Sequence, residues 1–383
     1  MRWSRRSGDR KSTSVETRTQ AYRRDLRDAL LAFLSSATFN HLPQSSAPLN
    51  FGILNARALA SFGDDMKLLA TKQVTLGFIG LGNMGSRIAQ RLLDHAYELT
   101  VFDLDNTKAE ALVLNGAVPA NDIAELAQSA DVILSCLTND EAVQNVYAGP
   151  EGALAGARSG TVVLEMSTIS PESSRELHNQ GAKLGVDVMD VAISGSTPAA
   201  EQGALTLLAG GNAELFQAAR LIFAAIARQY FHLGPSGAGT TMKLVVNTLL
   251  GVGMQAVAEA VVLGESAGLN RKLLLEVLSH TAVVAPAHFG KLARIERNDY
   301  SPQFPLRLMN KDFQLILKVA AEENVPMPVT EAAFRVNADE LASGQEQDFS
   351  AVMRRMEDLA GVALTHSTRE RMPIVPRCTR TPL

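Results

Sequence analysis

A lysine and an asparagine in an apolar stretch have the types and the spacing of an acid–base pair. Lys243 and Asn247 are four residues apart, so on a helix they project from one face, a turn apart. Met242 and residues 244–246 are apolar. A lysine in such surroundings is unusual unless it faces a cleft or a partner, although a lysine that snorkels to solvent near a helix start is an alternative.

The pair could exchange a proton with an oxygen that gains or loses a hydride. The ammonium of Lys243 could donate a proton to the oxyanion formed when a carbonyl accepts a hydride, and a partly desolvated, neutral lysine could remove the hydroxyl proton in reverse. Asn247 could hold the same oxygen or orient the lysine. These two residues are the candidate catalytic groups.

A glycine-rich segment predicts a dinucleotide site in another part of the chain. The apolar run 74–79 leads into Gly80-x-Gly82-x-x-Gly85 and then into a helical pattern. Gly80 permits a tight turn, Gly82 lets a pyrophosphate approach the backbone, and Gly85 lets the helix pack close to the strand. The helix N-terminus offers free N–H groups to the phosphates. In the alternative interpretation, the glycines serve only packing. The candidate cofactor residues here are Phe78, Ile79, Gly80, Leu81, Gly82, Asn83, Met84 and Gly85.

A carboxylate after the next apolar run indicates which dinucleotide is bound. Residues 99–102 end in Asp103, which comes 18 residues after Gly85. Such a carboxylate accepts hydrogen bonds from the adenosine ribose hydroxyls and repels a 2′-phosphate. Leu104 offers no cation for that phosphate. We therefore predict NAD, with NADP less favoured.

Composition limits the function classes. The chain has 383 residues, 46% of them hydrophobic and 20% charged, and a formal net charge of −4. This charge gives no reason to expect nucleic acid binding. The two cysteines show no disulfide framework and no metal-ligand spacing, so no metal is expected. The longest apolar run, 244–263, is interrupted by polar residues, so we predict a buried helix and no membrane partner.

The pattern of elements predicts two domains between dissimilar ends. From residue 73 to 236, strand-like and helical segments alternate, which is typical of an α/β, doubly wound parallel sheet with its ligand crevice at the carboxyl ends of the strands. Residues 237–361 read almost entirely as helix and predict an all-α domain. We expect residues 1–72 to form a disordered or leader-like extension and residues 362–383 a disordered tail. The expected location is cytoplasmic, or mitochondrial if the extension is a transit peptide.

Together these motifs resemble the β-hydroxyacid dehydrogenase family. The resemblance covers about residues 74–360. Besides the glycine loop and the lysine–asparagine helix, it rests on four further segments. These are Ser167-Thr168-Ile169, the run from Asp190 to Gly195, Lys311-Asp312-Phe313 and the run from Asp348 to Val352.

The resemblance implies a fold and site roles. The fold is a Rossmann domain joined to a helical domain by a long interdomain helix, with Lys243 as acid/base and Asn247 assisting. Ser194 and Gly195 would bind the carboxylate of a small-molecule substrate. Family members are typically dimers or tetramers packed through the helical domains. The implied cofactor contacts beyond the glycine loop are Leu137, Thr168 and Lys311.

The chain departs from the family pattern at three positions. The family commonly has proline after the fourth-strand leucine, where this chain has Thr138, which we keep among the cofactor-binding candidates. Its lysine motif keeps only the second asparagine, Asn247. The last glycine of the substrate loop is replaced by Ser196, whose side chain could narrow or redirect the pocket and leaves the substrate open.

The leading hypothesis is an NAD-dependent enzyme that moves hydride to or from a short 3-hydroxy acid or its semialdehyde. One alternative is reduction of tartronate semialdehyde, glyoxylate or succinic semialdehyde. Imine reductases share the architecture but commonly replace the lysine. A non-catalytic nucleotide sensor is an alternative of another class, against which Lys243 and Asn247 argue.

Two minor predictions concern other charged residues. Asp190 is expected to form a turn. Lys291, Arg294 and Arg297 are expected to form a solvated basic helix face.

Overall fold

The computed structural model describes residue 69 and residues 73–343 and 346–361. The predicted tail, and all of the predicted leader except Leu69, lie outside the described residues. The predictions about them, including the location in the cell, therefore stay predictions.

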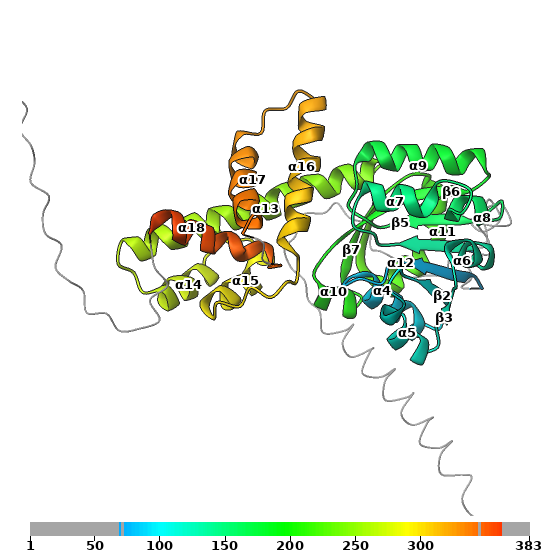
Figure 1. The fold of residues 1–383 in the computed structure, drawn as a ribbon, viewed down its shortest axis with the longest axis horizontal. Coiled ribbons are helices and arrows are strands. Elements are labelled where there is room, and N and C mark those ends of the chain that lie inside the picture. Colours follow the sequence, from blue (N-terminus) through cyan, green and yellow to red (C-terminus); the bar gives the residue numbers. More distant parts are fainter. Residues whose placement is uncertain (1–68, 70–72, 344–345, 362–383) are drawn as a thin grey trace, which may run out of the picture. The chain divides into compact units, whose positions relative to one another are not determined.

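The first half of the described chain forms one eight-stranded sheet in the order β3-β2-β1-β4-β5-β6-β7-β8 (Figure 1). The order places β1 between β2 and β4, as in a doubly wound fold with a crevice where the winding reverses. The strands are β1 Thr75–Ile79, β2 Glu98–Phe102, β3 Val118–Pro119, β4 Val132–Ser135, β5 Val162–Glu165, β6 Asp187–Ser194, β7 Leu205–Gly210 and β8 Ala227–His232.

The sheet confirms the predicted class but is not parallel throughout. Strands β6 and β7 pair antiparallel, whereas the other neighbours are parallel. Residues 195–204 join these two strands and contain only the short helix α10, Thr197–Glu201. So short a link does not provide the crossover that parallel pairing needs. Strands β3, β7 and β8 were not among the apolar runs that the sequence singled out.

Both faces of the sheet are covered by helices, because side chains alternate along each buried strand. On β1, Phe78 belongs to the core under α4 and α12, and Ile79 to the core under α6, α7 and α9. Both side chains are almost fully buried. The helices of these two layers are α4 Gly85–Asp94, α5 Glu110–Leu114, α6 Ile123–Ser129, α7 Asp140–Tyr147, α8 Ala153–Gly156, α9 Pro171–Lys183, α11 Ala213–Ala218 and α12 Arg220–Ile226.

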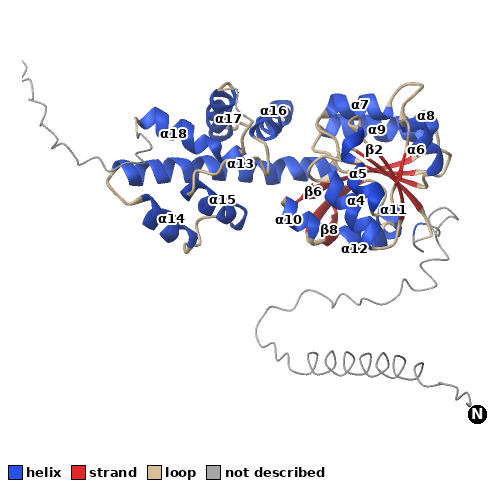
Figure 2. Ribbon diagram, turned by 60° about the horizontal axis from the view of Figure 1, so that its bottom comes forward, coloured by secondary structure: helices blue, strands red, loops and turns tan. Residues whose placement is uncertain are grey.

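After β8 the described chain is helical, as predicted. Helix α13, Ala238–Ser266, begins against β6 and β7 and continues between the later helices (Figure 2). Among the described residues, α13 is the one helix whose length and composition would allow it to cross a membrane. Here it supplies Met254, Ala258 and Val261 to the second core. The later helices are α14 Arg271–Ser279, α15 Pro286–Glu296, α16 Leu306–Glu322, α17 Pro328–Leu341 and α18 Val352–Ala360.

The prediction of a solvated basic face on α15 is wrong for two of its three residues. Lys291 and Arg294 are each only 8% exposed. Lys291 Nζ lies 2.7 Å from the buried carboxylate of Asp348, and Arg294 forms a two-pronged pair with Asp299. Buried charges of this kind are kept by such partners. Lys291 ties α15 to the segment before α18, and Arg294 ties α15 to the loop that directly follows it, so both roles are structural.

Candidate functional site

The glycine loop has the geometry that the motif predicts. Gly80 has φ +91°, and a Cβ there would lie 2.5 Å from the carbonyl oxygen of Cys136. A Cβ on Gly85 would collide with the carbonyl oxygen of Gly80. A Cβ on Gly82, by contrast, would meet nothing within 4 Å, so open space lies beside its backbone. The loop is therefore tight where it packs and open where a pyrophosphate would approach.

Asp103 lies at the end of β2 and contacts this loop. Its Oδ2 accepts the backbone N–H of Leu81 at 2.7 Å. Its Oδ1 accepts the N–H of Asp105 at 2.9 Å and lies 3.1 Å from the Nζ atom of Lys108. The neighbouring Leu104 side chain is 93% exposed. The carboxylate is thus placed beside the loop as predicted, but Lys108 supplies a cation that the sequence argument did not consider.

A buried polar cluster supports the carboxyl ends of β4 and β5. Ser135 and Glu165 are register neighbours on these strands. Tyr147 donates to the hydroxyl of Ser135 at 2.7 Å, and one oxygen of Glu165 accepts the backbone N–H of Ser167 at 2.9 Å. The Ser167 hydroxyl accepts the N–H of Leu137 at 2.7 Å. The cluster thereby joins the loops that carry two of the predicted cofactor residues, Leu137 and Thr168.

Glu165 is an unusual member of this cluster. It is 1% exposed, and its Oε2 atom has no hydrogen-bond partner among the described residues. Burial raises the pKa of its carboxyl to about 7, although hydrogen bonds from Ser167 oppose the shift. A carboxyl in this state changes charge near neutral pH. The sequence argument missed Glu165 because a single acid at the end of an apolar strand carries no motif.

The prediction that Asp190 forms a turn is wrong, because Asp190 lies within β6 and is 1% exposed. Its two oxygens accept the backbone N–H groups of Gly237 and Thr240 at 2.8 and 2.9 Å. Gly210 and Gly239 leave room for the carboxylate, since a Cβ on either would lie 2.8 Å from it. Asp190 thus caps the helix that carries Lys243, and this cap fixes where the helix begins.

Lys243 and Asn247 lie on the same face of α13 as predicted, and two residues of α16 meet them. Asn247 is 1% exposed, and its Nδ2 donates to Asp312 Oδ2 at 2.6 Å. Burial lowers the pKa of Lys243, Asp312 raises it, and Lys311 lowers it further. Lys311 Nζ lies 2.9 Å from Asp312 Oδ1 and also donates to the carbonyl oxygen of Thr168.

This cluster joins the helical region to the edge of the sheet that carries the glycine loop. Thr168 follows β5, while Lys311 and Asp312 belong to α16. A second link lies nearby, where Lys318 of α16 pairs with Glu172 of α9 at 2.9 Å. Burial raises the pKa of the thiol of Cys136, which follows β4, and the positive charges of Lys243 and Lys311 oppose this shift. The cluster of Asn247, Asp312 and Lys311 therefore reaches the carboxyl end of β5, at the edge of the sheet where the crevice is expected.

The predicted substrate residues lie at the end of the antiparallel strand β6. Ser194 is its last residue, and Gly195 follows with φ +146°, which favours glycine. Ser196 is the N-cap residue of α10, yet its side chain makes no capping hydrogen bond. The hydroxyl that replaces the family's glycine is consequently not used to hold the helix. Thr138 follows Leu137 and is exposed.

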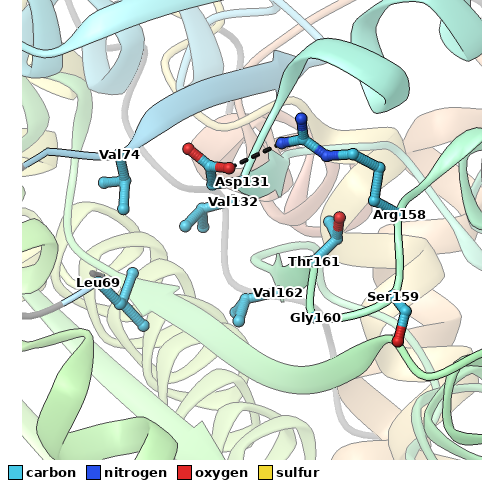
Figure 3. Close-up of a pocket in the computed structure, with 9 residues that line it drawn as sticks. All are labelled: Leu69, Val74, Asp131, Val132, Arg158, Ser159, Gly160, Thr161 and Val162. Atoms are coloured by element: carbon cyan, nitrogen blue, oxygen red, sulfur yellow. Dashed lines mark hydrogen bonds and ion pairs between the residues drawn. The ribbon is translucent and has the colours of Figure 1, made fainter. Parts of the chain in front are cut away.

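The hollow drawn in Figure 3 is not this site. It has a volume of about 220 Å³ and lies where Asp131 and Arg158 pair at 2.7 Å. Val74, Asp131 and Thr161 each come directly before a strand. The hollow is therefore at the amino ends of β1, β4 and β5. The glycine loop, Leu137 and Thr168 follow the carboxyl ends of the same strands.

The comparisons with known proteins agree with this arrangement. Residues 75–234 match a family model described as the NAD binding domain of 6-phosphogluconate dehydrogenase, and residues 237–356 match one described as "NAD-binding of NADP-dependent 3-hydroxyisobutyrate dehydrogenase". The 2-(hydroxymethyl)glutarate dehydrogenase of Eubacterium barkeri is 34% identical over 77% of this chain and 98% of the relative. The chain belongs to the β-hydroxyacid dehydrogenase family.

Two further relatives of this dehydrogenase support the assignment. The NAD-dependent L-serine dehydrogenase of Pseudomonas aeruginosa is 36% identical over 75% of this chain and 99% of the relative. The crystal structure of a 3-hydroxyisobutyrate dehydrogenase from Salmonella typhimurium aligns with a TM-score of 0.69 at 26% identity, over 73% of this chain and 99% of that one. The protein is thus an oxidoreductase of the hydroxyacid dehydrogenase type, and its cofactor is NAD, as predicted.

Proposed function

We propose that the protein transfers hydride between NAD and a short 3-hydroxy acid, with Lys243 as acid/base. The observation that carries this proposal is the position of Lys243, half-buried and one turn before Asn247 on α13. Asn247 is bonded to Asp312, which pairs with Lys311, and Lys311 reaches Thr168 after β5. The residues present fit a dinucleotide, since Gly82 borders open space and the Asp103 carboxylate lies beside the loop. When bound, the nicotinamide supplies or accepts the hydride. We assign Leu137, Thr138, Thr168 and Lys311 to holding it.

The side chain of Lys243 handles the proton that accompanies the hydride. In reduction the ammonium gives a proton to the substrate oxygen, and in oxidation the neutral amine removes it. Burial lowers the pKa of Lys243, which makes the neutral form easier to reach, while Asp312 opposes this shift. Oxidation should therefore gain rate as pH rises through the pKa of Lys243, and reduction should lose rate over the same interval.

The test is replacement of the lysine. Lys243→Ala should lower kcat by about 10²- to 10⁴-fold, the usual contribution of general acid–base catalysis. NAD binding should persist, because the glycine loop and Asp103 lie on the sheet. Lys272→Ala, at an exposed position of α14, is a matched control. Near wild-type turnover by Lys243→Ala, measured by absorbance of the reduced nicotinamide, would rule out this role.

The substrate class follows from the chemistry that the relatives' names share. L-serine, 3-hydroxyisobutyrate and 2-(hydroxymethyl)glutarate each carry a primary alcohol on the carbon next to the one that bears the carboxylate. We propose that this chain takes a compound of the same class or its semialdehyde, with the carboxylate held at Ser194 and Gly195. Glyoxylate and succinic semialdehyde, substrates named for other relatives, are the alternatives. A panel of these acids and aldehydes with NAD and NADH decides among them.

We also propose that two or more copies of the chain associate through the helical region. Met242, Val245, Leu249 and Leu263 are exposed on α13 at spacings of a heptad seam, with Leu249 73% exposed. An apolar stripe of this kind is typical of a contact between helices. Leu249→Lys together with Leu263→Lys should yield monomers in light-scattering chromatography, whereas Lys272→Ala should not. A wild-type protein that is monomeric would exclude the proposal.

A further inference from the structure

Asn247 holds its amide in one orientation because of a residue on another helix. Asp312 is 1% exposed, and its Oδ2 atom lies 2.6 Å from Asn247 Nδ2. A carboxylate only accepts hydrogen bonds, so the amide atom that faces Asp312 is the nitrogen. The other oxygen of Asp312 lies 2.9 Å from Lys311 Nζ. The oxygen of the amide therefore points away from Asp312.

That oxygen is an acceptor without a protein donor. Asn247 Oδ1 is buried and has no hydrogen-bond partner among the described residues. Leaving a buried carbonyl oxygen without a hydrogen bond destabilises the protein, so a donor is expected in the working site. Lys243 is one turn earlier on the same face of α13. Either the Lys243 ammonium or a substrate hydroxyl can donate a hydrogen bond to Asn247 Oδ1.

We propose that Asp312 is a positioning residue, which orients the Asn247 amide so that its oxygen receives the Lys243 ammonium or the substrate hydroxyl. The inference rests on the proposed function of Lys243. It also decides between two roles for Asn247 that its sequence position left open. Asn247 orients the proton donor by accepting a hydrogen bond from it, rather than stabilising the oxyanion by donating one.

The same carboxylate acts on Lys243 through its charge. Asp312 favours the ammonium form of Lys243, against burial and against the like charge of Lys311. Replacing Asp312 with a neutral side chain should therefore lower the pKa of Lys243. Oxidation requires the neutral amine, so the acidic limb of its pH–rate profile should then move to lower pH. A residue that only stabilises the fold would not move this limb.

Asp312 also pairs with Lys311, and the experiment must separate the two contacts. Lys311 donates to the carbonyl oxygen of Thr168, so losing Asp312 could act through the cofactor loop. The variants are Asp312→Ala, Asp312→Asn, Asn247→Ala and Lys311→Met, with Asp312→Ala combined in turn with each of the last two. The readouts are kcat, KM, NAD affinity and the pH profile of oxidation.

We expect Asp312→Ala to lower kcat by about 10- to 100-fold, the usual range for a lost charge-assisted hydrogen bond. In the Asn247→Ala background the same substitution should cause little further loss, because the amide it orients is already absent. Asp312→Asn keeps the acceptor but can also present its NH₂ group, so it should be intermediate. Its acidic limb should lie at lower pH than that of the wild type.

Three results would overturn the inference. Additive losses of Asn247→Ala and Asp312→Ala would show that the two residues act separately. If the effect of Asp312→Ala is non-additive only with Lys311→Met, and NAD affinity is weakened, Asp312 acts through the cofactor loop. An unmoved acidic limb in Asp312→Asn, which keeps size and shape even if Asp312→Ala fails to fold, would exclude its effect on Lys243. Failure of the proposed function is distinguishable, since Lys243→Ala would then retain turnover.

Discussion

Asp190 accepts the backbone N–H of Thr240 at 2.9 Å, and through this bond a strand of the sheet holds the first turn of α13, the helix that carries Lys243. Its second oxygen holds Gly237 in the same way at 2.8 Å. Thr240 is three residues before Lys243 on α13. The place of the lysine therefore depends on a carboxylate in β6.

Asp190→Asn should loosen this helix start. The new NH₂ group would face a backbone N–H, so one of the two bonds is lost, at a cost of about 2 kcal/mol. We expect a lower free energy of unfolding and a lower kcat, with NAD affinity nearly unchanged. Denaturant titration and steady-state rates measure these quantities. Asp187→Asn, at an exposed position of the same strand, is the control, and equal behaviour of the two variants would contradict the expectation.

Glu165 should make the stability of the protein depend on pH. Burial raises its pKa from 4.5 to about 7, so between these values the folded state binds more protons than the unfolded state. Stability from this residue is therefore present at low pH and is lost as pH rises toward and through 7, by up to about 3 kcal/mol.

The substitution Glu165→Gln removes this titration while keeping the size of the side chain. We expect the difference in unfolding free energy between about pH 5 and about pH 8 to shrink in the variant. The control is Glu176→Gln, at an exposed position on α9. An identical pH dependence in Glu165→Gln and the wild type would show that the carboxyl does not titrate in this range.

The cofactor preference should change when the end of β2 changes. Asp103→Asn with Leu104→Arg removes a carboxylate that repels the 2′-phosphate and adds a cation that binds it. The same change releases Lys108, now 3.1 Å from Asp103, as a second cation. We expect the ratio of kcat/KM for NADP to that for NAD to rise by about 10- to 100-fold. Leu104→Ala should leave the ratio unchanged, and an unchanged ratio in the double variant would oppose the role of Asp103.

Ser196 should influence which acid is accepted. Its hydroxyl is not used as a helix cap, so it is free to face the substrate. Ser196→Gly restores the family's glycine and should raise kcat/KM for acids with larger substituents next to the carboxylate. Ser196→Ala separates the hydroxyl from the volume of the side chain. A substrate profile that both variants leave intact would place Ser196 outside the pocket.

Much of the fold could be predicted because its signals are local. An apolar run followed by Gly80, Gly82 and Gly85 specifies a strand, a turn and a helix through neighbouring residues alone. Of the strands that were missed, β3 has only two residues and most side chains of β8 are exposed, so no apolar run marks either of them. Strand β7 is buried and largely apolar, and it was missed although its sequence carries that signal. The boundary between the predicted domains near residue 237 remains a prediction.

The glycine loop and the placement of Lys243 and Asn247 on one face of a helix could be predicted from the sequence, since each depends on spacing within one segment. Their surroundings come from residues far away along the chain, which meet them only in the folded protein. Asp312 reaches Asn247 across a separation of 65 residues, and Asp190 reaches Gly237 across 47. Whether a buried acid orients an amide, caps a helix or titrates near neutral pH depends on which distant groups fold against it, and spacing along the chain does not contain that information.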